Sequence, residues 1–126
     1  MRVAISASGE DLEAKVDSRF GRCQNILIVE SESMEFESVP NENAMVAGGA
    51  GIQVAQTIIG KGVKAVITGN IGPNAYQILK AGGVKILTGA SGTVREAVER
   101  FKKGELQETD SPTVGGHFGM RGMGRR

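Results

Sequence analysis

The feature that most constrains the fold is an alternation of helical and strand-like segments that begins near residue 51. In order, the pattern predicts a helix over 51–59, a strand over 63–68, a helix over 73–81, a strand over 84–87 and a helix over 94–102. Pro73 suits the first turn of its helix, and Thr93 with Glu96 forms a capping box. Such an alternation requires parallel strands joined by right-handed crossovers.

Three further strands precede this alternation. Residues 3–7 and 26–29 are short apolar runs, and residues 34–39 alternate apolar and polar side chains, as a half-exposed antiparallel strand does. We expect these three to form an antiparallel meander. The predicted architecture is therefore α/β, with one mixed five-stranded sheet flanked by helices.

Length and composition limit the class of protein. A chain of 126 residues buries a single core, and 40% hydrophobic residues without Trp imply an aliphatic core. No segment reaches the length of a membrane span, and the N-terminus reads as a strand rather than a signal peptide. One cysteine allows no internal disulfide, which agrees with a reducing compartment. We expect a cytoplasmic protein without a membrane partner.

The charge is distributed unevenly. Residues 114–126 hold three Arg and no acid, whereas residues 1–113 hold twelve Lys and Arg against fourteen Asp and Glu, a net charge of −2. With a net charge of +1 overall, bulk electrostatics do not favour nucleic acid. We expect a domain over 1–104 and a flexible Gly/Arg/Met-rich tail over 105–126.

Three glycine-rich loops precede the three predicted helices, at 48–51, 69–72 and 89–92. The carboxyl ends of parallel strands meet at one sheet edge, and helix N-termini there present N–H groups to anions. Gly49, Gly51, Asn70 and Gly72 are the candidate binding residues. Glycines are also ordinary turn residues. No loop matches a phosphate-binding or dinucleotide fingerprint, which disfavours nucleotides.

Cys23 is the single cysteine and lies beside Arg19 and Arg22. Nearby cations stabilise a thiolate, so we expect this thiol to ionise more easily than a free one. A thiolate is the usual protein ligand of iron–sulfur clusters, whereas the structural alternative is a small buried hydrophobe. Arg19 and Arg22 would balance the charge of such a cluster.

His117 is the single histidine and is the candidate second metal ligand. The alternative is a solvated residue of the tail. One His, one Cys and scattered acids form no credible catalytic triad and no zinc motif, so we expect no enzyme. Residues 3–7 and 63–68 also carry no acids for metal-assisted phosphoryl chemistry.

Four motifs resemble the dinitrogenase iron–molybdenum cofactor biosynthesis family. They are Asp17–Cys23, Gly48–Gln53, Thr68–Ala75 and Gly92–Val98, and the resemblance spans about residues 1–104. It implies a ribonuclease-H-like fold and non-catalytic binding of an anionic iron–sulfur or iron–molybdenum–sulfur cluster. The tail resembles that of an archaeal branch that binds iron–sulfide material in storage particles. Better-studied carriers offer more His and Cys residues than this chain.

The leading hypothesis is a cluster carrier, scaffold or store that works with cluster donor and acceptor proteins. We expect a monomer or weak homo-oligomer. A single cysteine per chain suggests that a cluster is shared between chains, because iron–sulfur clusters usually take several thiolates. The alternative is a metal-free protein-interaction module that docks partners through its basic tail. A hydrolase or transferase on the same scaffold ranks last.

Overall fold

The structure is a computed structural model that describes residues 1–41 and 50–113. Its elements, in chain order, are β1 (Arg2–Ala7), the short 3₁₀ helix η1 (Phe20–Arg22), β2 (Asn25–Glu30), β3 (Phe36–Pro40), α1 (Ala50–Gly60), β4 (Ala65–Ile67), α2 (Pro73–Ala81), β5 (Lys85–Leu87) and α3 (Val94–Lys102). This order of strands and helices is the one that the hydrophobic pattern predicts. Among the described residues, η1 is the one additional helical element.

The five strands form one mixed sheet in the order β3-β2-β1-β4-β5. The pairs β1–β2 and β2–β3 are antiparallel, and the pairs β1–β4 and β4–β5 are parallel. The predicted meander and the predicted parallel portion are both confirmed, and they share β1 as the central strand. The arrangement is compatible with a ribonuclease-H-like fold.

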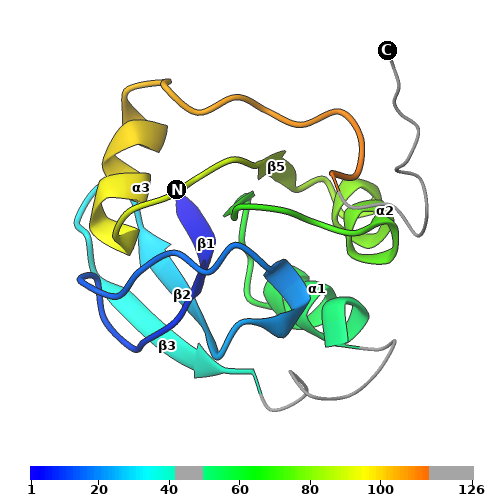
Figure 1. Cartoon of the computed structure of the whole chain (residues 1–126), viewed down its shortest axis with the longest axis horizontal. Coiled ribbons are helices and arrows are strands. Elements are labelled where there is room, and N and C mark those ends of the chain that lie inside the picture. Colours follow the sequence, from blue (N-terminus) through cyan, green and yellow to red (C-terminus); the bar gives the residue numbers. More distant parts are fainter. Residues whose placement is uncertain (42–49, 114–126) are drawn as a thin grey trace.

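Each face of the sheet has its own layer of helices. One core cluster joins Ala4, Ile28 and Val66 to side chains of α1 and α2, such as Ile58 and Leu79. The other cluster lies on the opposite face and contains the alternate strand residues together with α3. In Figure 1, α1 and α2 lie on one side of the strands and α3 lies on the other. Strands buried on both faces explain the continuous apolar runs of β1 and β4.

Residues 105–113 continue the folded domain, and we call them the C-terminal strap. They run from α3 across β5 toward α2 (Figure 1). The amide of Thr109 donates to Ile86 O at 2.7 Å, and Glu108 forms an isolated antiparallel β-bridge with Leu87. Leu106 packs against the core cluster on the α3 side of the sheet. These contacts join the nine positions to the domain, and the boundary expected at residue 104 stays a prediction. Residues 114–126 lie outside the described part of the chain.

In the described residues, no helix is both long and apolar enough to cross a membrane.

Candidate functional site

Two loops meet at the sheet edge where the parallel strands β1 and β4 end. The amide of Asn70 donates to Ser18 O at 2.7 Å, and the amide of Phe20 donates to Asn70 O at 3.2 Å. These bonds form a parallel bridge between Arg19 and Asn70. The structure thus brings together two of the predicted motifs, 17–23 and 68–75, which are about fifty positions apart in the sequence.

Gly69 makes the close approach of the two loops feasible. A Cβ at this position would lie 2.6 Å from Ser18 Cα and 3.0 Å from Ser18 O. Below the contact, Ser6 Oγ donates to Asp17 O at 2.7 Å and lies 2.7 Å from the hydroxyl of Thr68. Buried hydroxyls need such partners, so this pair connects the ends of both strands to the 17–23 loop.

Arg19, Arg22 and Asn70 expose their side chains at this edge. The Arg19 side chain is 66% exposed and lies 3.4 Å from a carboxylate oxygen of Asp17. Asp17 also accepts the Arg19 amide at 2.9 Å, which fixes the turn. The edge therefore presents cationic side chains to solvent from a loop that backbone hydrogen bonds hold in place.

The N-terminus of α2 lies at the same edge, and some of its amides donate to no described residue. Gly72 is the N-cap, it provides no side-chain cap, and the first turn has no acid. Within the described residues, the amides of Gly72, Asn74 and Ala75 have no hydrogen-bond acceptor. Free amides and the positive end of the helix dipole attract anions.

The N-terminus of α3, by contrast, is fully satisfied. Thr93 and Glu96 form the predicted capping box, with N···O distances of 2.9 and 3.1 Å. The next two amides donate to the carbonyls of Ala14 and Leu12, both at 2.9 Å. Capping by the Thr93 amide also lowers the pKa of Glu96, so an anion already occupies this terminus. The loop 89–92 is therefore no candidate anion site, although its glycine pattern resembles that of 69–72.

The environment of Cys23 differs from the one expected for an easily ionised thiol. Its side chain is 0% exposed, and its Sγ donates to Phe20 O at 3.1 Å. Burial, assisted by the negative charge of Asp17, raises the pKa of the thiol from 9.0 to about 12. The expectation of easier ionisation is therefore wrong, because η1 covers the sulfur and Arg19 turns toward Asp17. The structural alternative, a small buried hydrophobe, describes Cys23 in this conformation.

Asn41 is a residue of this edge that the sequence reasoning missed. Its side-chain amide donates to Gly21 O and to Cys23 O, both at 3.0 Å, and its backbone amide donates to Gln24 O at 2.9 Å. Asn41 thereby attaches the η1 segment to the end of β3. A polar side chain that directly follows a strand was the available signal.

The remaining predicted residues divide into two groups. Gly51 lies in the first turn of α1, where a Cβ would lie in ordinary van der Waals contact, 3.4 Å from Ala75 Cβ, so it marks a point where α1 packs on α2. Gly49 and His117 lie outside the described residues. Within residues 1–41 and 50–113, no group of three or more His, Cys, Asp or Glu side chains could hold a metal ion.

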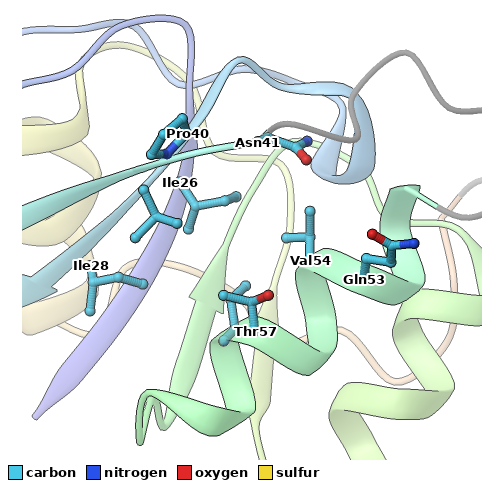
Figure 2. Close-up of a pocket in the computed structure, with 9 residues that line it drawn as sticks. Ile26, Ile28, Pro40, Asn41, Gln53, Val54 and Thr57 are labelled. Atoms are coloured by element: carbon cyan, nitrogen blue, oxygen red, sulfur yellow. The ribbon is translucent and has the colours of Figure 1, made fainter.

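A cavity of about 310 Å³ lies between β2, the end of β3 and α1. In Figure 2, Val54 and Thr57 of α1 face Ile26 and Ile28 of β2, and Gln53 lies nearer the start of the helix. Its floor is aliphatic, and neither arginine of the 17–23 loop lines it. A polyanion would find no cation there, so we assign the site to the neighbouring loop edge rather than to this cavity.

Comparison with known proteins agrees with this arrangement. The apo form of the orange protein from Desulfovibrio gigas superposes with a TM-score of 0.86 at 36% identity, covering 90% of this chain and 96% of that one. A Thermotoga protein provisionally named NifB gives 0.78 at 40% identity, covering 90% and 97%. An uncharacterized protein of Methanocaldococcus jannaschii is 32% identical over 97 residues, which are 75% of this chain and 82% of that protein.

The sequence pattern of one family matches residues 1–104, which include every strand and helix of the structure. The chain therefore belongs to the dinitrogenase iron–molybdenum cofactor family.

Proposed function

We propose that this protein binds an anionic iron–sulfur or iron–molybdenum–sulfur cluster as cargo and carries or stores it without chemical turnover. The observation that carries the proposal is the uncapped N-terminus of α2, beside the exposed Arg19 and Arg22. Its amides of Gly72, Asn74 and Ala75 have no acceptor in the part of the chain that the structure describes. Amides and guanidinium groups suit the outer sulfides of a polyanionic cluster. Family membership and the likeness to an apo protein support the same conclusion.

Electrostatic contacts, rather than a thiolate, hold the cargo in this proposal. A thiol with a pKa of about 12 is almost entirely protonated at neutral pH, so Cys23 is a metal ligand only if the 17–23 segment opens. Asn70 borders the site, and Gly51 and Gly49 would add the α1 terminus. His117 would be the second ligand. Cluster donor and acceptor proteins would exchange the cargo at this exposed edge, with the protein as a monomer or weak homo-oligomer in the cytoplasm.

Anaerobic reconstitution with iron and sulfide, with and without molybdate, tests the proposal. Bound metal and visible absorbance are compared for wild type, Arg19→Gln, Arg22→Gln, Cys23→Ala and the matched control Arg95→Gln. Arg95 pairs with Glu13 on the α3 side at 2.7 Å, so its loss changes the net charge equally but away from the site. We expect replacement of either site arginine to lower the affinity for the cluster by up to about fivefold, since exposed ion contacts contribute up to about 1 kcal/mol.

Cys23→Ala should retain most of the bound metal. Loss of the chromophore in Cys23→Ala alone, with both arginine variants unchanged, would contradict the electrostatic site and favour an opened thiolate site. A colourless protein under all conditions would favour the second candidate, a metal-free interaction module that uses the basic tail. One observation favours that second candidate: the described residues contain no cluster of side chains that could ligate a metal ion.

A further inference from the structure

The two edges of the sheet differ in what covers them. At the β5 edge the C-terminal strap continues the sheet, since Glu108 forms an isolated β-bridge with Leu87 and the Thr109 amide donates to Ile86 O. At the other edge, no segment of the described residues pairs with the outer side of β3 (Figure 1). An open strand edge is a template for pairing with another strand.

The hydrogen bond just beyond β3 shows which backbone groups of this strand point outward. The Asn41 amide donates to Gln24 O at 2.9 Å, so the odd-numbered residues of the strand direct their backbone groups toward β2. In an antiparallel ladder the alternate residues point the other way. Phe36 and Ser38 therefore each direct an amide and a carbonyl to the open edge, whereas Pro40 directs only a carbonyl.

Phe36 adds an apolar surface to the same edge. Its side chain is 44% exposed, and it is one of two large hydrophobic residues that are exposed in the described part of the chain. Its cross-strand partner Val29 belongs to the core cluster on the α3 side, so Phe36 lies on that face of the sheet. A strand that pairs with β3 would cover part of this ring.

We propose that β3 pairs with β3 of a second copy of this chain, antiparallel and about a two-fold axis at Ser38. In this register each Ser38 amide donates to the carbonyl of the partner's Ser38. Each Phe36 amide donates to the carbonyl of the partner's Pro40, and the Phe36 ring lies beside that proline on the same face of the joined sheet. Every outward amide of β3 then has an acceptor.

The charges of β3 fit a second copy. Glu37 is the single charged residue of the strand, and its carboxylate lies 3.0 Å from the Lys61 ammonium of its own chain. The register places Glu37 opposite the partner's Val39, so no like charges stand directly opposite each other. Because each carboxylate brings its own cation, the edge needs no basic partner strand, which favours a second copy over a cationic peptide.

The size of the edge predicts a weak dimer. A strand of five residues spans about 17 Å, and its pairing covers less than the roughly 1,200 Å² that stable complexes bury. The two-fold axis also turns the loop edges of the two copies in opposite directions, so each copy keeps its own open site. The inference goes beyond the proposed function and does not depend on it.

Sedimentation velocity of the full chain, from about 10 µM to 1 mM, measures this association. We expect the sedimentation coefficient of wild type to rise toward that of a dimer. Ser38→Pro should stay monomeric, because it removes an outward amide and no bond to β2. Ser38→Ala keeps that amide and is the matched control, which should associate as wild type does, and circular dichroism at 222 nm shows whether Ser38→Pro is folded.

Pro40→Val gives a second test that does not require Ser38→Pro to fold. Valine restores the amide that proline lacks, so each Phe36 carbonyl gains a donor from the partner. We expect the dissociation constant to fall at least about tenfold. Equal association of Pro40→Val and wild type, or of folded Ser38→Pro and Ser38→Ala, would overturn the inference. Wild type that stays monomeric throughout would also overturn it and leave the edge to an extended segment of another protein.

Discussion

Replacing Gly69 by alanine should separate the two loops of the site. The new Cβ would lie 2.6 Å from Ser18 Cα, 2.9 Å from Ser18 Cβ and 3.0 Å from Ser18 O, and two of these three atoms belong to the backbone. A backbone cannot move aside by a rotamer change, so either the loop shifts or the contact remains strained. Such overpacking costs about 1–3 kcal/mol.

A shift of the loop would also weaken the two hydrogen bonds that join Asn70 to Ser18 and Phe20. Each contributes about 0.5–1.5 kcal/mol. Because either adjustment costs a similar amount, we expect Gly69→Ala to lower the free energy of unfolding by about 1–3 kcal/mol. With a urea m-value of about 2 kcal/mol/M, the midpoint should fall by roughly 0.5–1.5 M.

Urea unfolding followed by circular dichroism at 222 nm measures this change, and Gly60→Ala is the matched control. Gly60 ends α1, and no heavy atom lies within 4 Å of the point that a Cβ would occupy there, so alanine should be neutral or stabilise by up to about 1 kcal/mol. A Gly69→Ala midpoint within about 0.3 M of wild type would refute the reasoning, because it would mean that the loops are not in contact as described.

Three further predictions concern buried or capping groups. Because the folded-state pKa of Cys23 is raised from 9.0 to about 12, its contribution to stability is complete below pH 9 and is lost as the pH rises toward 12. Between about pH 8 and pH 10.5, the free energy of unfolding should therefore fall more for wild type than for Cys23→Ala. Equal decreases in the two proteins would contradict the burial of the thiol. Thr93→Ala should lower the free energy of unfolding, measured with urea, by about 1 kcal/mol, because it removes the side-chain half of the capping box with Glu96. An unchanged urea midpoint would mean that the cap contributes nothing to stability. Ser6→Ala should cost about 1–3 kcal/mol and lower the melting temperature, since it leaves the buried hydroxyl of Thr68 without its 2.7 Å partner; a variant as stable as wild type would show that Thr68 finds another acceptor.

The sequence predicted the fold well because local patterns and the global sheet agree. Pro73 and the Thr93–Glu96 box predicted the starts of α2 and α3, and the apolar runs predicted the buried strands. The sequence predicted that the strands of the alternation run parallel, but it did not predict that β4 pairs with β1. The strap was missed because it is held by backbone bonds from Thr109 and Thr113, which polar composition does not reveal.

The candidate site was predicted only in part. The loops 17–23 and 68–72 do meet, and Arg19, Asn70 and Gly72 do share one edge. The environment of Cys23 was predicted wrongly because flanking arginines say nothing about which side chains fold over a sulfur. Likewise, the glycine loops at 69–72 and 89–92 look alike in sequence, and only the acceptors in the folded chain show that the helix after the second loop has no free amide in its first turn.

The central place of β1 has a consequence for the order of folding. On one side β1 pairs with the neighbouring β2, whereas on the other Val3 pairs with Ala65, some sixty positions later. During synthesis the meander can therefore form early, but one flank of β1 stays uncovered until β4 leaves the ribosome. Domains that depend on such non-local strand pairing fold slowly, on a scale of roughly milliseconds to seconds. For that interval the nascent chain exposes an apolar strand edge, the kind of surface that chaperones recognise.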